Sequence, residues 1–142
     1  MMSILRKQEQ TYWRKKGVKV HKGDLCNERL VRYLFETVKF DAVIHMAAQA
    51  GVAYSVVDPI SYVTANIECL VNMLDILADY KDVHLVYSSS SSVYGHNPIV
   101  PFSPKNPLMA PSNMYAALKV QKMNIWLIEW SLVHVLCLEV IN

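Results

Sequence analysis

Hydrophobic and polar positions follow two different periods along this chain. From Leu30 to Val38, apolar side chains recur every three or four positions, which predicts a helix with one buried face. The segment from Pro59 to Ala78 has similar spacing and starts with proline, a residue favoured in the first turn of a helix. By contrast, Ala42–Ala48 and Val83–Tyr87 are continuous apolar runs, which are typical of strands buried on both faces.

The remaining segments extend this pattern to both ends of the chain. We expect a polar helix from about Ser3 to Lys16 and a short strand from Val18 to His21. A further helix is predicted from Met114 to Trp130, and a last strand from Val133 to Ile141. Residues 88–113 contain five of the six prolines and form a long loop, and loops of this length are often functional.

Alternating helices and strands predict an α/β fold with a parallel sheet. In such sheets, ligands bind beyond the carboxyl ends of the strands. The segments that follow the predicted strands are Gly23–Leu25, Met46–Ala48 and the serine run Ser88–Ser92. We therefore expect all three segments to line one edge of the sheet.

Composition narrows the class of protein. The 142 residues suffice for about one domain, and a hydrophobic content of 53% argues against disorder. The net charge of +2 comes mainly from basic residues near the N-terminus, which have few stacking aromatics among them, so a solvated helix face is favoured over a nucleic-acid surface. The apolar stretch Ile125–Ile141 is interrupted by charges, so we expect no membrane span.

The cysteines and histidines give no sign of a metal site or a disulfide framework. Cys26, Cys69 and Cys137 are odd in number and far apart, which favours a reducing, cytoplasmic setting. The five histidines also lack metal-ligand spacing. We therefore expect neither a bound metal nor a disulfide framework.

Several single residues have two interpretations at this point. Asp24 can act as a helix cap or a turn residue, and its position alone favours this role. The alternative is a contact to an adenine amino group. His45 is expected to pack in the core. Asn66 falls near a buried helix face and needs a partner, either a loop backbone or a cofactor wall. Tyr54 and Tyr94 suit packing and substrate contact equally.

Tyr115 and Lys119 are the residues with the most direct chemical meaning. Four positions apart on a helix, they lie on one face, and a nearby ammonium group favours the phenolate form of a tyrosine. Such a tyrosine can exchange protons with a ligand. The Ser88–Ser92 run directly follows a predicted strand, so its hydroxyls favour ligand binding over a flexible linker.

Four segments, in this order, resemble the extended short-chain dehydrogenase/reductase superfamily, which contains nucleotide-sugar epimerases and dehydratases. The similarity runs from about Gly17 to Lys122. Within the superfamily, the sequence is most similar to UDP-glucuronate 4-epimerases. The segments are Lys22–Leu25, Val43–Val52, Ser88–Gly95 and Tyr115–Lys119. The resemblance implies that residues 1–142 form a partial NAD-binding domain, with a Rossmann-like doubly wound parallel sheet.

The resemblance also implies roles in catalysis. Tyr115 would be the acid/base, Lys119 its activator and a ligand of the nicotinamide ribose, and Ser90 the hydroxyl that hydrogen-bonds the reacting sugar. The implied reaction is transient oxidation at sugar C4, followed by hydride return to the opposite face. Ser91 and Ser92 stand where related dehydratases carry an Asp-Glu pair, which disfavours dehydration and leaves both hydroxyls available to a sugar carboxylate.

The implied cofactor is NAD, held tightly because each cycle regenerates it. Asp24 and Leu25 match the pair that contacts adenine. Met46, Ala47 and Ala48 match the wall beside the cofactor. A nucleotide sugar is the implied partner, and the resemblance suggests a homodimer through the helices near residues 59–78 and 114–130.

The chain departs from the family pattern in three places. The family's first strand, its glycine-rich turn for the pyrophosphate and its second strand have no counterpart here. The match decays after Lys122, and Ala53 stands where the family usually has arginine. We therefore expect a fragment of an NAD-dependent nucleotide-sugar 4-epimerase. The alternative is a non-catalytic Rossmann-type binding module or an inactive truncated homologue.

The missing glycine-rich turn predicts that the 142-residue chain alone binds NAD⁺ weakly and does not turn over. Titration of the purified chain with NAD⁺, together with an epimerisation assay on UDP-glucuronate, measures both properties. Micromolar binding combined with measurable turnover would contradict this expectation.

Overall fold

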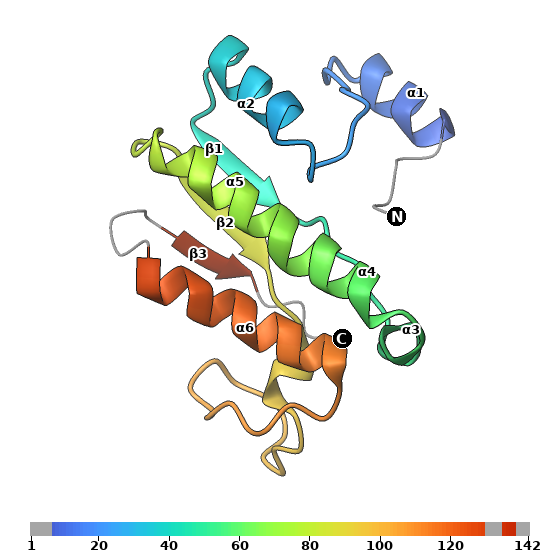
Figure 1. Cartoon of the computed structure of the whole chain (residues 1–142), viewed down its shortest axis with the longest axis vertical. Coiled ribbons are helices and arrows are strands. Elements are labelled where there is room, and N and C mark those ends of the chain that lie inside the picture. Colours follow the sequence, from blue (N-terminus) through green and yellow to red (C-terminus); the bar gives the residue numbers. More distant parts are fainter. Residues whose placement is uncertain (1–6, 130–134, 139–142) are drawn as a thin grey trace.

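A parallel sheet of three strands lies at the centre of the structure, a computed structural model that describes residues 7–129 and 135–138 (Figure 1). The strands are β1 (Ala42–His45), β2 (His84–Ser88) and β3 (Val135–Leu138), in the order β1-β2-β3. Val43 pairs with Leu85, and Tyr87 pairs with Cys137. The predicted α/β fold with a parallel sheet is confirmed.

Helices connect the strands and precede them. Pro59–Ala78 is one continuous helix that contains a π turn, and Asp58 caps it by accepting a hydrogen bond from the Ser61 N–H over 3.2 Å. Asn27 caps α2 in the same way, through the N–H of Leu30. The helical segments are α1 (Lys7–Lys15), α2 (Glu28–Thr37), α3 (Val52–Val57), α4 (Pro59–Val63), the π segment η1 (Thr64–Glu68), α5 (Cys69–Ala78), the 3₁₀ segment η2 (Ser91–Tyr94) and α6 (Met114–Glu129).

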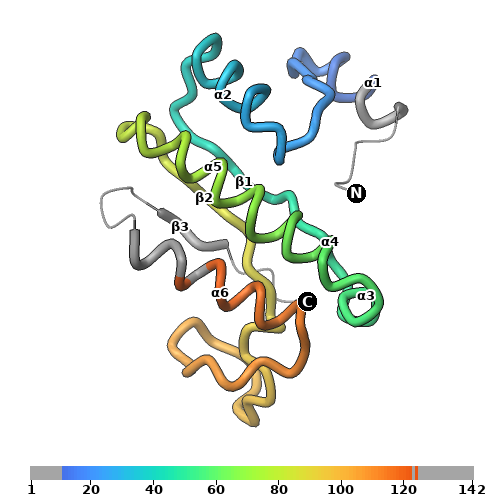
Figure 2. Tube along the Cα trace, in the orientation of Figure 1, coloured from blue at the N-terminus to red at the C-terminus, as the bar shows by residue number. Residues whose placement is uncertain are grey.

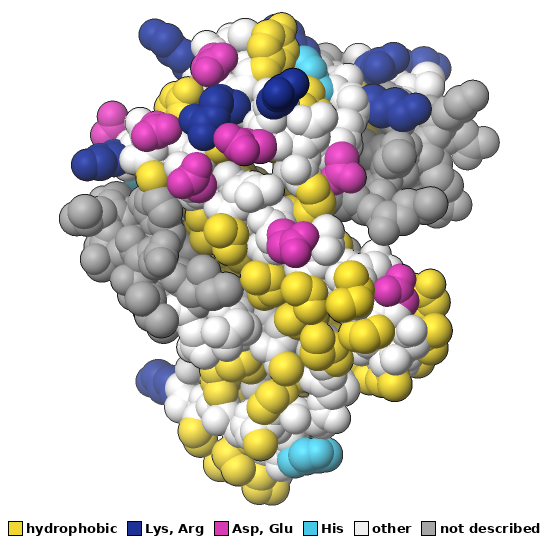
Figure 3. Space-filling view, viewed as in Figure 1, with side chains coloured by type: hydrophobic (Ala, Val, Ile, Leu, Met, Phe, Trp, Pro, Cys, Tyr) yellow, Lys and Arg dark blue, Asp and Glu magenta, His cyan; other side chains and the backbone are white. Residues whose placement is uncertain are grey.

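The hydrophobic core lies between α2, α5 and the helix-facing side of the sheet. Phe35 from α2, Leu77 from α5 and Leu85 from β2 are all buried there. Charged side chains gather over α2 and α5 on the outer face, whereas hydrophobic ones gather over α3 and α4 (Figure 3). The apolar periodicity of the 59–78 helix therefore reflects its position against the core.

Among the described residues, one helix, Pro59–Ala78, is long and apolar enough to cross a membrane by length and composition alone. Its apolar side chains have another explanation in this fold. Leu70, Met73 and Leu74 are each about 3% exposed and pack in the core. A core helix of this composition passes the same test as a membrane span.

Two expectations about secondary structure need correction, and one helix was not expected. Residues 18–21 form no strand, because no neighbouring strand offers them a ladder of hydrogen bonds. β1 ends at His45, so residues 46–48 continue as an irregular segment. Helix α3 was not predicted, because its six residues are too few to show helical periodicity.

The ends of the chain agree with the predictions where the structure describes them. α1 begins at Lys7, and Ser3–Arg6 of the expected helix lie outside the described residues. α6 extends to Glu129, and Trp130 lies outside them as well. Of the expected last strand, Val135–Leu138 is confirmed, whereas residues 133–134 and 139–141 are not described.

A disulfide joins Cys26 to Cys69, which corrects the expectation that the cysteines are unpaired. The two residues are 43 positions apart in the sequence. They meet because the turn before α2 lies against the first residue of α5. Sequence spacing gives no signal for a pair that only the tertiary fold brings together.

Strand β1 lies at one edge of the sheet and is open to solvent on one side. A cavity of about 250 Å³ lies beside it, between α2 and the strand, and is lined entirely by apolar residues such as Leu34, Phe40 and Val43. Ile44, which also lines this cavity, is 65% exposed. Among the described strands, β1 therefore has no neighbour on this side.

The core position of Leu77 gives a stability prediction. Leu77 is 1% exposed, so Leu77→Ala should lower the free energy of unfolding by about 2–5 kcal/mol through lost burial and a residual cavity. The control is Val71→Ala on the same helix, because Val71 is 42% exposed and should cost much less. Urea denaturation measures both values, and equal losses would show that this helix face is not buried as described.

Candidate active site

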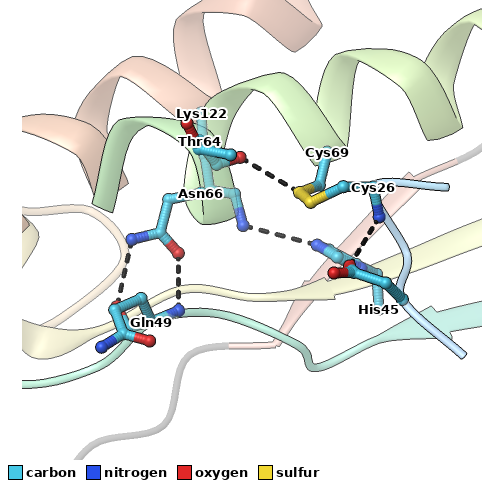
Figure 4. The surroundings of a disulfide bond; sticks show 8 residues. Cys26, His45, Gln49, Thr64, Asn66, Cys69 and Lys122 are labelled. Carbon is cyan, nitrogen blue, oxygen red and sulfur yellow. Dashed lines mark hydrogen bonds between the residues drawn. A yellow bond between two sulfur atoms is a disulfide. The ribbon is translucent and has the colours of Figure 1, made fainter. Parts of the chain in front are cut away.

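The segment after β1 is held in place by two buried side chains from the 59–78 helix. Asn66 is 1% exposed, and its amide accepts a hydrogen bond from the N–H of Gln49 and donates one to its carbonyl, each over 3.0 Å. The Tyr62 hydroxyl lies within donating distance of the carbonyls of Ala50 (2.8 Å) and Gly51 (2.7 Å). Figure 4 shows the Asn66 amide facing Gln49. Asn66 thus bonds a loop backbone, one of the two alternatives for it.

Tyr115 and Lys119 lie at the start of α6, beside the carboxyl end of β2. The Lys119 ammonium donates a hydrogen bond to the carbonyl of Ser88 over 3.1 Å and lies 5.7 Å from the centre of the Tyr115 ring. The Tyr115 ring meets the ring of Tyr62 edge-on, with centroids 6.4 Å apart. Lys119 is buried at 4% exposure, whereas Tyr115 is partly exposed. The phenol is therefore open to a ligand, while the cation is fixed beneath it.

The serine run forms a tight turn against α6. Ser90 caps η2 by accepting a hydrogen bond from the N–H of Ser92 over 3.3 Å, and its hydroxyl also lies 3.2 Å from that of Ser92. The turn ends at Gly95 with φ of +55°, where a Cβ atom would collide with the carbonyl of Ala110. Helix α6 packs directly against η2. Ser90, Ser91 and Ser92 are thereby held next to the helix that carries Tyr115.

The two tyrosines with open interpretations differ in the structure. Tyr94 is buried and stacks on Phe102, with ring centroids 4.7 Å apart, so it packs within the loop. Tyr54 is 52% exposed on α3.

The loop of residues 95–113 extends beyond the end of β2, below α6 in the view of Figure 2.

Asp24 and Leu25 lie on the turn that leads into α2, on the other side of β1 from α6 (Figure 1). The Asp24 carboxylate accepts a hydrogen bond from the N–H of Cys26 over 2.9 Å, the turn interaction expected from its position. Leu25 packs against the core cluster. Asp24 is exposed, so the adenine contact remains a prediction.

Met46, Ala47 and Ala48 follow β1 directly and lie between these two regions. Met46 is 65% exposed, and the two alanines are partly exposed. Their chain path is fixed by the bonds of Asn66 to Gln49. These residues thus form an accessible segment at the carboxyl end of the strand, and their role as a cofactor wall remains a prediction.

A buried pair, His45 and Lys122, was not predicted from the sequence. The Lys122 ammonium lies 3.4 Å from Nε2 of His45, and both residues are at most 5% exposed (Figure 4). Burial, followed by the charges of Lys122 and Lys119, lowers the pKa of His45 from 6.5 to about 3. Burial, and then the charge of Lys119, lowers the pKa of Lys122 to about 8. His45 is therefore neutral and accepts a hydrogen bond that Lys122 donates.

The sequence did contain a signal for two of the residues that sequence reasoning missed. Lys122 follows Tyr115 by seven positions and Lys119 by three, so all three lie on one helix face. Tyr62 precedes Asn66 by four positions, although the π turn lies between them and alters simple helical phasing. No local sequence pattern indicates that Lys122 contacts β1 or that Tyr62 contacts residues 50–51.

Comparison with known proteins shows where this arrangement belongs. The model of the GDP-mannose 4,6-dehydratase family matches residues 2–130, and the chain therefore belongs to this family. Two similar relatives are UDP-glucuronate 4-epimerases 3 and 1 of Arabidopsis thaliana. The first is 43% identical over 116 residues, covering 81% of this chain and 27% of the relative. The second is 47% identical over 105 residues, covering 73% of this chain and 24% of the relative.

Solved structures agree with these sequence matches. A UDP-glucose 4-epimerase from Bifidobacterium longum in complex with NAD⁺ and UDP superposes with a TM-score of 0.78 and 25% identity. That match covers 89% of this chain and 39% of the solved chain. The present chain thus spans about a quarter of the length of the Arabidopsis relatives, and it has the fold of part of a nucleotide-sugar epimerase.

The buried Lys122 makes stability depend on pH. Its pKa is about 8 in the folded chain and about 10.5 in the unfolded chain, so the unfolded state binds more protons between these values. Stability should therefore rise as the pH increases from about 8 to about 10.5. Lys122→Met should raise the free energy of unfolding near neutral pH by roughly 2 kcal/mol, because the relieved burial cost exceeds the lost contact to His45.

Urea denaturation at neutral and alkaline pH measures this effect. The control is Lys39→Met, because Lys39 is exposed and its removal should change neither the stability nor its pH dependence by much. An unchanged alkaline rise in the Lys122→Met variant would contradict the assignment of this dependence to Lys122.

Proposed function

We propose that this chain is part of an NAD-dependent nucleotide-sugar 4-epimerase that acts on UDP-glucuronate or UDP-galacturonate. The observation that carries the proposal is the position of Tyr115 and Lys119, with the Lys119 ammonium fixed 3.1 Å from the carbonyl of Ser88. The serine turn packs against the same helix. Identity of 43–47% to UDP-glucuronate 4-epimerases supports this choice of substrate class.

The proton-transfer chemistry follows from these positions. Tyr115, as phenolate, takes the proton from the sugar 4-hydroxyl at its Oη atom and later returns it. The buried Lys119 ammonium lies beside the Tyr115 ring and would donate a hydrogen bond to the nicotinamide ribose. Ser90 orients the reacting hydroxyl, because its own hydroxyl can both donate and accept. Held by Asp24, Leu25, Lys119 and the segment Met46–Ala48, NAD⁺ would supply the hydride acceptor and donor for sugar C4.

The described residues fit NAD along one edge of the sheet. The exposed Asp24 carboxylate offers an acceptor for the adenine amino group, beside Leu25. Met46, Ala47 and Ala48 form an accessible wall beyond β1, and small alanine side chains permit close approach. Solved UDP-glucose 4-epimerases from Brucella ovis and Bifidobacterium longum contain NAD or NAD⁺, which supports the same cofactor here.

Epimerisation is favoured over water elimination. Ser91 and Ser92 carry hydroxyls where related dehydratases have an acidic pair, so no carboxyl group is present at these positions to move the protons of an elimination. The same hydroxyls can hydrogen-bond the carboxylate of a uronic acid.

A homodimer and a cytoplasmic location complete the proposal. On the outer face of α3 and α4, the side chains of Val56, Val57 and Ile60 are 73–74% exposed. Val71, on the same continuous helix, is 42% exposed. An apolar face of this kind supports contact with a second copy. The alternative, a non-catalytic binding module, is disfavoured because Tyr115, Lys119 and Ser90 would have no use in it.

The proposal can be tested in a chimeric enzyme. Residues 17–122 replace the aligned segment of the Arabidopsis UDP-glucuronate 4-epimerase 3, and epimerisation of UDP-glucuronate is measured. The chimera should be active, and Tyr115→Phe should lower kcat by about 10²–10⁴-fold with a smaller change in KM, because the transferred proton loses its acceptor.

The matched control is Tyr33→Phe, which changes a tyrosine that is 57% exposed on α2 and should leave kcat unchanged. Formation of a 4,6-dehydrated keto sugar in place of the epimer would overturn the assigned reaction. An active chimera that tolerates Tyr115→Phe would overturn the role of Tyr115.

A further inference from the structure

The Cys26–Cys69 disulfide lies outside the proton-transfer site, and the proposed function does not use it (Figure 4). Its two ends differ in access to solvent. Cys26 is partly exposed on the turn before α2, whereas Cys69 is 1% exposed at the start of α5. An external thiol can therefore reach the Cys26 sulfur, while the Cys69 sulfur is shielded.

The buried cysteine of the pair, Cys69, also lies beside a hydrogen-bond acceptor for its reduced thiol. Sγ of Cys69 lies 3.1 Å from the carbonyl oxygen of Thr64, inside the π segment. A disulfide sulfur has no proton to donate, but a reduced Cys69 has one and can form an S–H···O hydrogen bond there. Reduction would thus leave Cys69 with a partner, and the 59–78 helix can accommodate both states.

Apart from the backbone, the disulfide is a covalent link between the turn before α2 and the core. Residues 18–24 form neither helix nor strand, and all of them are largely exposed except Val20, which is partly exposed. Among the described elements, α1 packs against none of the others. Leu25 makes the nearest apolar contact with the core. Opening of the disulfide would therefore release the turn while the core stays packed.

We propose that Cys26 and Cys69 form a thiol–disulfide exchange site that reacts with glutathione and its disulfide and controls the packing of residues 18–27. In the reducing direction, a glutathione thiolate attacks Sγ of Cys26, the S–S bond breaks, and Cys69 leaves as a thiolate that takes up a proton. A second glutathione thiolate then attacks the glutathione sulfur of the mixed disulfide. Cys26 leaves and takes up a proton, and glutathione disulfide is released.

The oxidising direction reverses these steps. The Cys26 thiolate attacks glutathione disulfide, one glutathione leaves, and Cys69 then displaces the second from Cys26. Two electrons pass from the protein thiols to glutathione disulfide, and two glutathione molecules are formed. Asp24 lies on the same turn, and its carboxylate is within 4.8 Å of both sulfurs. Exchange would therefore also control the adenine contact of Asp24, a consequence that rests on the proposed function, unlike the exchange itself.

The test uses the full chain, equilibrated with glutathione and glutathione disulfide at a series of ratios, with a chelator present to exclude metal ions. Acid quenching, alkylation of free thiols and peptide mass spectrometry report the paired fraction. We expect reversible Cys26–Cys69 pairing with a single midpoint. Hydrogen exchange at the N–H groups of Cys26 and Asn27, which donate to Asp24, should become several-fold faster on reduction, whereas residues 69–78 should stay protected.

Cys137→Ser is the matched control and should leave the midpoint unchanged. Cys26→Ser should abolish pairing and give the fast exchange at residues 26–27 under all conditions. Protection of residues 69–78 shows in each variant that the fold is retained. Cys26→Ala provides a second variant if the serine form does not fold. Pairing of Cys26 with Cys137, absence of the Cys26–Cys69 link at every ratio, or equal hydrogen exchange in both states would overturn the proposal.

Discussion

The helix from Pro59 to Ala78 buries its apolar face in the core, and its side chains position most parts of the site. One end supplies buried leucine and methionine side chains to the core. At the other end, Tyr62 and Asn66 face the segment after β1 and form hydrogen bonds with it. The Tyr115 ring rests edge-on against Tyr62. Because burial of apolar surface is the main driving force of folding, the geometry of the site follows from that of the core.

The electrostatics of the site also depend on burial. Lys119 and Lys122 project from one face of α6 into the protein, at 4% and 2% exposure. His45 remains neutral beside them, because burial and both positive charges oppose its protonation. Burying positive charge in a region of low dielectric opposes folding, so this arrangement costs stability.

Sequence periodicity predicted the longer helices, the strands at β1 and β2 and the parallel sheet, because these depend on local patterns of side chains. The Tyr115–Lys119 pair was predictable for the same reason, since it lies on one helical face. Prediction failed at residues 18–21, where strand propensity exists but no partner strand does. It also failed for Cys26–Cys69 and Lys122–His45, which are 43 and 77 positions apart. Such pairs form only when the complete chain packs.

The π turn at Thr64–Glu68 separates the half of the helix that builds the core from the half that builds the site. A π turn contains one residue more than an α turn and changes the direction of all side chains beyond it by about 100°. Loss of a single residue here would leave a regular helix of equal apolarity, but Tyr62 would no longer face Ala50 and Gly51. An insertion or deletion within this segment should therefore disturb the site more than a substitution on the exposed face of the helix.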